Sequence, residues 1–171
     1  MAVRRRDGGG RPFTFYKFRT MYADARTRYP ELYTYDYRPE DLTTLPMKVL
    51  MGTKTGELGE DPRVPPLCRW LRRSSIDELP NLWNVLKGDM HLVGPRPDIP
   101  ENLPYYQPWH LGKFEVKPGV TGLAQVNGSG RLPFDKTLAY DVEMVERRSL
   151  ALDAAILLRT LSRFLSRDGA F

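Results

Sequence analysis

Residues 67–97 read LCRWLRRSSIDELPNLWNVLKGDMHLVGPRP, and the other motifs of the chain lie around this stretch. It places two adjacent carboxylates, Asp77 and Glu78, between an arginine-rich segment and a GPRP turn. Carboxylates with basic side chains on both sides are suited to binding a phosphate together with a divalent cation. A local alternative is a capping box, in which the Ser75 hydroxyl and the Glu78 carboxylate satisfy backbone N–H groups at a helix start. Both interpretations stay open from these residues alone.

Helices are predicted on both sides of Ser75. Prolines 65 and 66 open the first helix, and the second is predicted to run from Ile76 to Leu86 and to stop at Gly88. Adjacent residues of a helix point about 100° apart, so Asp77 and Glu78 are expected to have different tasks. An apolar stripe at helical spacing is expected to belong to the core: Leu79, Leu82, Trp83 and Leu86.

Length and composition indicate one domain with an anionic partner. The 171 residues are enough for a real core, and 26 Lys and Arg against 21 Asp and Glu give a net charge of +5. The single cysteine, Cys68, excludes an internal disulfide, and two histidines exclude the usual zinc spacings. We find neither an apolar run long enough to span a membrane nor the apolar core of a signal peptide.

The first 61 residues divide into three predicted parts. Residues 1–11, basic and glycine-rich, are expected to form a flexible arm. Residues 12–21 alternate like a strand, which would put Lys17 and Arg19 on one face where they could meet a diphosphate. A solvated basic strand edge is the alternative. Residues 22–61, rich in tyrosine, proline and glycine, are expected to be a variable surface excursion without catalytic spacing.

Two later segments carry further candidate contacts. In the GPRP turn, two prolines fix the backbone around Arg96, which suits a bidentate phosphate clamp or an ordinary rigid turn. Residues 114–126 are predicted as a hairpin joined by Pro118 and Gly119. Lys117 and Gln125 in that segment could contact a nucleotide, or be incidental polar residues.

The C-terminal part is predicted to be helical. Residues 135–148 place Asp141 on the same face as Leu138, and an inward carboxylate needs a metal or an ion-pair partner. The last helix, residues 149–165, is basic and amphipathic, so it could lie on an anionic bilayer or pack on the core. Its predicted inward residues are Leu150, Ala154, Leu157, Leu161 and Phe164 or Leu165. Altogether we expect an α+β fold: one mainly helical domain with short strands or a hairpin.

Three separated motifs together resemble the bacterial sugar transferase family, monotopic polyprenyl-phosphate phosphoglycosyl transferases. These motifs are YKFRTM, SIDELPNLWNVLKGDMHLVGPRP, and KPGVTGLAQVNG followed by DVEMVERRSLALDAAILLRT. The resemblance covers most of residues 12–160 and implies that residues 12–171 form the catalytic domain. Residues 22–61 match least.

The resemblance also implies a reaction and its site. Asp77 would be the nucleophile, Glu78 and Asp141 would organise Mg²⁺, and Lys17 and Arg96 would match the family's basic motif positions. A sugar-1-phosphate would pass from a nucleoside diphosphate sugar, expected to be a UDP-sugar, to polyprenyl (undecaprenyl) phosphate through an aspartyl phosphosugar. This is the first membrane step of glycan assembly.

The resemblance implies a place at the cytoplasmic face of the inner membrane, peripheral or monotopic. Family members carry a re-entrant membrane helix ahead of the basic arm, and this chain begins after that place. Either an upstream part was removed, or the chain docks through its C-terminal helix and arm. We expect an anionic membrane surface as a partner. We do not expect nucleic acid, because no recognisable reader motif is present. A homodimer stays open. The alternative function is a weakly active module of the same fold that binds membranes or partners.

Overall fold

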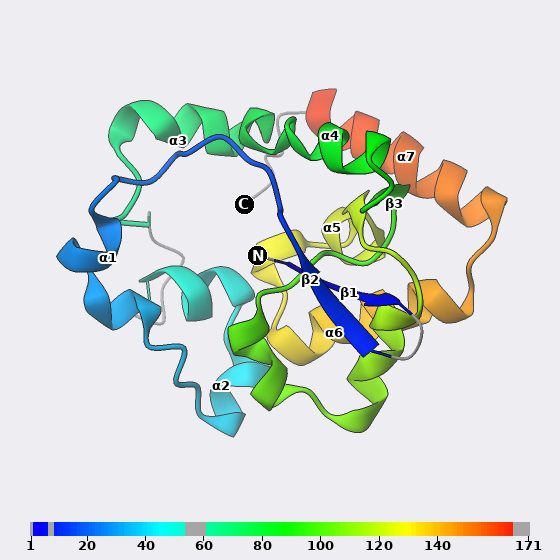
Figure 1. The fold of residues 1–171 in the computed structure, drawn as a ribbon, viewed down its shortest axis with the longest axis horizontal. Helices are drawn as coiled ribbons and strands as arrows, with labels where there is room; N and C mark the ends of the chain where they lie inside the picture. Colours follow the sequence, from blue (N-terminus) through cyan, green and yellow to red (C-terminus); the bar gives the residue numbers. More distant parts are fainter. Residues whose placement is uncertain (1, 7–8, 54–60, 166–171) are drawn as a thin grey trace.

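A computed structural model of the protein describes residues 2–6, 9–53 and 61–165. Within these ranges the fold is a mainly helical α+β domain, as predicted (Figure 1). The two-stranded pairings are β1–β2 and β3–β4. The α-helices and strands are β1 (Ala2–Arg6), β2 (Gly9–Phe13), α1 (Ala25–Arg28), α2 (Pro39–Thr44), α3 (Pro66–Arg73), α4 (Asn81–Leu86), β3 (His91–Val93), β4 (Gly119–Thr121), α5 (Leu123–Val126), α6 (Phe134–Glu146) and α7 (Leu150–Leu165).

Short helical turns of other types connect these elements. One turn of π-helix, Val49–Thr53, follows α2. The 3₁₀ turns are Pro30–Tyr33, Ile76–Glu78, Pro100–Tyr105, Pro108–Glu115 and Ser129–Arg131.

The N-terminal segment differs from the prediction. Strands β1 and β2 pair antiparallel, with Ala2 opposite Phe13, so the described part of residues 1–11 is a hairpin and not a flexible arm. The predicted strand over residues 12–21 is also wrong, because regular pairing ends at Phe13 and residues 14–20 run on without regular secondary structure. Two of their backbone groups hydrogen-bond to the side chain of Asn84 on α4 instead of to a neighbouring strand.

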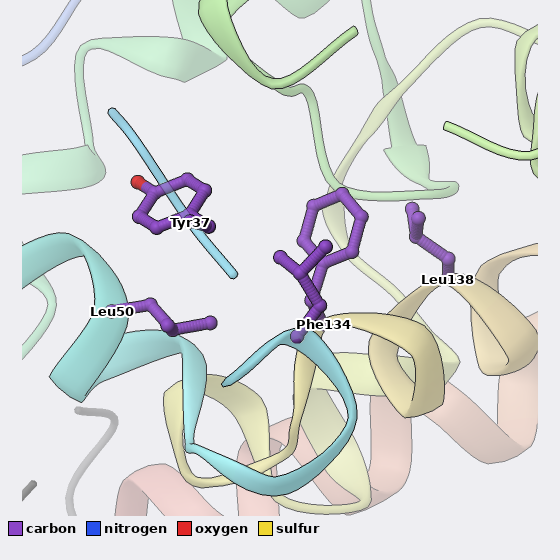
Figure 2. Packing of buried hydrophobic residues seen from close by; sticks show 5 residues of the cluster. Tyr37, Leu50, Phe134 and Leu138 are labelled. Atoms are coloured by element: carbon purple, nitrogen blue, oxygen red, sulfur yellow. The ribbon is translucent and has the colours of Figure 1, made fainter. Parts of the chain in front are cut away.

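The segment predicted as a surface excursion supplies much of the core. Tyr37, Leu42 and Leu50 from this segment pack in one buried cluster with Phe134 and Leu138 of α6 (Figure 2). The backbone N–H of Met47 donates to the Leu132 carbonyl at 2.8 Å, which fastens the segment to the chain just before α6. The surface prediction is therefore wrong for the described part; residues 54–60 lie outside the described residues. The many prolines and tyrosines of this segment indicated a surface loop, and its core positions were therefore not recognised from the sequence.

Strands β3 and β4 are parallel, with His91 opposite Gly119 and Val93 opposite Thr121. The predicted hairpin over residues 114–126 is therefore wrong: residues 108–115 are 3₁₀-helical, and β4 pairs with a strand 28 residues upstream. The Gly119 backbone lies so close to Gly94 that a β-carbon at Gly119 would overlap the Gly94 backbone. This close approach holds the GPRP turn against β4.

The predicted helix over residues 76–86 is divided in two: a 3₁₀ turn, Ile76–Glu78, precedes α4. The expectation that its apolar stripe belongs to the core is wrong. Leu79 is 53% exposed, Trp83 56% and Leu86 79%. Trp70 on α3 is 65% exposed, and both helices run along one edge of the molecule (Figure 1). We call this set the apolar face: Leu67, Trp70, Leu79, Leu82, Trp83 and Leu86.

Helix α7 is present as predicted but turns another face inward. Ile156 is buried and Leu152 packs beside it, in a cluster with Val93, Leu123 and Met144. The residues predicted to face inward are instead exposed at the described positions: Leu150, Ala154, Leu157 and Leu161. The helix carries two apolar stripes, and periodicity alone does not choose between them. Among the described residues, no helix is both long and apolar enough to cross a membrane.

Candidate functional site

The two carboxylates of the central motif lie on the 3₁₀ turn Ile76–Glu78. Asp77 is 2% exposed, and the Glu78 side chain is 12% exposed. The capping box, the alternative interpretation of this motif, is absent: Ser75 makes no side-chain cap hydrogen bond and adopts a left-handed conformation with φ of 55°. A left-handed non-glycine residue is strained, and such strain concentrates at functional sites. The structure therefore favours the site over the cap.

Lys17 reaches Asp77 from the extended segment that follows β2. Its Nζ lies 2.9 Å from Asp77 Oδ2 and 3.7 Å from Glu78 Oε1. The neighbouring Phe18 N–H donates to the Asp77 carbonyl at 2.9 Å. The lysine is therefore fixed beside the carboxylates by backbone as well as by charge.

Asn84, fully buried on α4, holds the same segment in place. Its amide nitrogen donates to the Thr14 carbonyl at 2.7 Å, and its amide oxygen accepts from the Tyr16 N–H at 3.2 Å. A side-chain amide thus replaces the strand partner that these residues lack. This role could not be predicted from the sequence, because an asparagine on a short helix also fits a solvated surface.

Arg96 meets Glu78 from the GPRP turn. The guanidinium donates to Glu78 Oε1 at 2.9 Å. Burial raises the pKa of Glu78, but the charges of Arg96 and then Lys17 outweigh it, so the pKa lies below its ordinary value. Burial likewise opposes the charge of Arg96, and Glu78 outweighs it, so the pKa of Arg96 is raised. Both groups are held ionised.

These residues line one cavity of about 430 Å³. Of the predicted site residues, Lys17, Asp77, Glu78, Arg96 and Gln125 are among its lining. The Gln125 side-chain oxygen and nitrogen are buried and make no hydrogen bond within the described residues. Such a group, facing a cavity, is suited to a ligand.

Arg19, Lys117 and Asp141 are not among the lining residues. Arg19 is exposed, because the segment that carries it is not a strand and does not present every second residue to one face. The Lys117 ammonium lies toward Gly88, beyond α4.

Asp141 is fully buried on α6, as predicted from its position on the same side of that helix as Leu138. Its Oδ2 lies 2.8 Å from the Lys113 Nζ, and that lysine is also buried. Burial raises the pKa of Asp141, and the Lys113 charge opposes that rise. The ion pair, the alternative to a metal role, is the arrangement that this geometry supports.

Several lining residues were not predicted from the sequence. Tyr33, Tyr35, Met47 and Met51 come from the segment predicted as a surface excursion. Arg63 fastens that segment: it donates to the Met51 carbonyl at 2.6 Å and pairs with Asp61 at 2.8 Å. Arg69 and Arg72, from the arginine-rich part of the central motif, also line the cavity.

Comparison with known proteins identifies the family to which the sequence is similar. Residues 2–167 match the family model described as Bacterial sugar transferase. The chain is 41% identical over 160 residues to the uncharacterized sugar transferase EpsL of Bacillus subtilis, covering 94% of this chain and 66% of EpsL. It is 38% identical over 162 residues to the undecaprenyl-phosphate galactose phosphotransferase of Salmonella typhimurium, covering 95% of this chain and 32% of the relative.

A third relative is the UDP-glucose:undecaprenyl-phosphate glucose-1-phosphate transferase of Caulobacter vibrioides. It is 36% identical over 171 residues, covering 95% of this chain and 55% of the relative. The chain thus spans between about a third and two thirds of the length of these relatives. Because the family match covers nearly the whole sequence, the chain belongs to the bacterial sugar transferase family.

Proposed function

We propose that this chain transfers a sugar-1-phosphate from a UDP-sugar to undecaprenyl phosphate through a covalent intermediate on Asp77. The observation that carries the proposal is the Lys17–Asp77 ion pair at 2.9 Å in the wall of a cavity that also holds Arg96 and Glu78. A buried carboxylate surrounded by cations is poised to meet the negative charge of a diphosphate without repelling it. Relatives of the chain carry names with the same donor and acceptor classes.

The reaction divides into two displacements at one phosphorus. In the first, an Asp77 carboxylate oxygen bonds to the sugar-linked phosphorus, and the bond to the nucleoside monophosphate breaks, with the electron pair leaving on that group. In the second, a phosphate oxygen of the lipid bonds to the same phosphorus, and the Asp77 carboxylate is regenerated. Lys17 and Arg96 neutralise the charge that collects on the phosphate oxygens. Two moderate steps replace one difficult transfer.

The residues present fit Mg²⁺ as the cofactor. Among the described residues, no group of three or more acidic, histidine or cysteine side chains could hold a metal by itself. Mg²⁺, however, is usually held by one or two carboxylates together with substrate phosphates and water. Glu78 lines the cavity beside Asp77 and would be the protein ligand to an ion that arrives with the diphosphate. When bound, Mg²⁺ supplies further charge neutralisation on the donor.

The apolar face is the proposed contact with the membrane. Six large apolar side chains, two of them tryptophans, lie exposed on α3 and α4 and the turn between them. Patches of this kind mark interaction surfaces, and tryptophan favours the boundary between apolar and wet surroundings. The net charge of +5 favours an anionic surface. Docking there would bring the cavity to a lipid-linked acceptor at the cytoplasmic face of the inner membrane.

The proposal is tested by incubating the protein with Mg²⁺, undecaprenyl phosphate in detergent, and UDP-galactose or UDP-glucose, following UMP release. We expect release that depends on the lipid for multiple turnovers and is lost in Asp77→Asn. Exposed Asp24→Asn, at a position outside the cavity lining, is the matched control and is expected to retain full release. Equal release by Asp77→Asn would overturn the nucleophile assignment.

A further inference from the structure

Tyr35 has an unusual backbone conformation at the edge of the cavity. Its φ is 47°, in the left-handed region, and it shares this property with Ser75 alone among the described non-glycine residues. For a residue with a β-carbon this conformation is sterically unfavourable. It persists where surrounding contacts impose it, and such positions concentrate at ligand sites. Tyr35 is half-buried and lines the cavity.

A second tyrosine imposes this conformation. The Tyr105 hydroxyl donates to the Tyr35 carbonyl at 2.8 Å and accepts from the Tyr37 N–H at 3.1 Å. The Tyr105 ring also packs on the Tyr37 ring, with centroids 5.2 Å apart. One hydroxyl thus clamps the backbone on both sides of residue 36 and fixes where the Tyr35 ring lies.

Tyr35 is the aromatic ring of this wall that is best placed for a ligand. The ring of Tyr33, its neighbour in the lining, is approached by the guanidinium carbons of Arg26 and Arg63 at 5.3 and 5.1 Å. Tyr35 instead packs beside the core cluster and shares the cavity lining with the thioether side chains of Met47 and Met51. The lining that Tyr35 shares therefore includes soft, apolar side chains.

The sugar and the nucleobase of a nucleotide sugar bind to different kinds of side chain. A sugar ring presents hydroxyls and needs hydrogen-bonding groups, which Gln125 and Thr137 offer in the same cavity. A nucleobase presents a planar face that stacks on aromatic rings. Resting on the proposed function, we propose that Tyr35 stacks on the base of the nucleotide donor and that Tyr105 is its positioning residue. The segment of residues 33–51 then recognises the nucleoside.

The test compares Tyr35→Leu, Tyr35→Phe and Tyr105→Phe with the wild-type protein. The measurements are kcat and KM for UDP-galactose, and inhibition by UMP and by galactose 1-phosphate. We expect Tyr35→Leu to raise the UMP inhibition constant and the KM together by about tenfold, the size of one lost stacking contact. Inhibition by galactose 1-phosphate should not change. Tyr35→Phe keeps the ring and should keep wild-type values.

Tyr105→Phe keeps its ring packing but loses both hydrogen bonds to the backbone around Tyr35. We expect a rise in the UMP inhibition constant of about threefold or more, with kcat retained. Tyr140→Phe, in a separate smaller cavity, is the matched control and should match wild type. Thermal unfolding of each variant separates lost folding from lost binding.

Two outcomes would overturn this assignment. If Tyr35→Leu weakens galactose 1-phosphate and leaves UMP unchanged, the wall belongs to the sugar arm; if neither changes in a folded variant, Tyr35 is outside the donor site. Failure of the proposed function is distinct, since the wild-type protein would then release no UMP from any UDP-sugar.

Discussion

Arg96 and Glu78 form an ion pair at 2.9 Å that joins the GPRP turn to the carboxylate next to the proposed nucleophile. The two residues lie 18 positions apart in the sequence. The turn is itself held by the close approach of Gly94 and Gly119. The pair therefore connects the β3–β4 unit to the motif that carries the chemistry.

The first prediction concerns pH. The pKa of folded Glu78 lies below its ordinary value of about 4.3. The folded protein therefore binds fewer protons at this group than the unfolded chain. The contribution of the Glu78 carboxylate to the free energy of unfolding is complete above about pH 4.3 and is lost as the pH falls through the lower pKa of the folded state. We expect Glu78→Gln to lower the free energy of unfolding by about 2 kcal/mol at pH 7, the worth of a hydrogen bond between charged groups. The difference should shrink below about pH 4.

Urea unfolding at pH 7, 5 and 3.5 measures this difference. Glu143→Gln is the control, because its partner Arg147 lies exposed one helical turn away and such pairs contribute less than about 0.5 kcal/mol. A Glu78→Gln effect that is constant over the whole range would contradict the assigned ionisation.

The second prediction concerns Asn84. In Asn84→Ala the Thr14 carbonyl and the Tyr16 N–H lose their partner, which should lower the free energy of unfolding by about 2 kcal/mol. Because Lys17 then loses its placement, kcat should also fall, on the order of tenfold or more. Thermal unfolding and UMP release measure the two effects. Asn127→Ala, whose side-chain amide donates to the Leu123 carbonyl at the end of α5, should leave kcat unchanged. Wild-type kcat in Asn84→Ala would count against the positioning role.

The third prediction separates an ion pair from a metal site at Asp141. Lys113→Met leaves a buried carboxylate without its cation and should lower the free energy of unfolding by about 3 kcal/mol. Adding Asp141→Asn should recover part of that loss, a coupling that a double-mutant cycle quantifies. In Asp141→Asn alone, the Mg²⁺ concentration for half-maximal rate should not change. A marked rise in that concentration would support the metal role expected from the family resemblance.

The fourth prediction concerns the apolar face. Two of the three tryptophans, Trp70 and Trp83, lie on it, and Trp109 does not. In Trp109→Phe, vesicles that contain anionic lipid should shift the fluorescence of Trp70 and Trp83 to shorter wavelength, because their rings enter an apolar environment. In the complementary variant, with Trp70→Phe and Trp83→Phe, the Trp109 fluorescence should not shift. A shift confined to Trp109 would place the membrane contact elsewhere.

Particular residues show what could be predicted from the sequence. Lys17, Asp77, Glu78 and Arg96 were predicted because they stand in ordered motifs, and the structure brings them together. Tyr35 was missed because its place depends on Tyr105, 70 residues away. The Leu79 stripe was misjudged because helical periodicity identifies an apolar face without saying whether protein covers it. At Gly119, the Pro-Gly turn signal suggested a hairpin, while the true partner strand lies upstream.

The covalent intermediate on Asp77 is the central claim, and isotope exchange tests it most directly. The protein is mixed with UDP-galactose, Mg²⁺ and radiolabelled UMP, with no lipid acceptor. If Asp77 carries the phosphosugar, reversal of the first step must move label into UDP-galactose, and Asp77→Asn must show none. Label that enters UDP-galactose only when undecaprenyl phosphate is present, or equally in Asp77→Asn, would contradict the account.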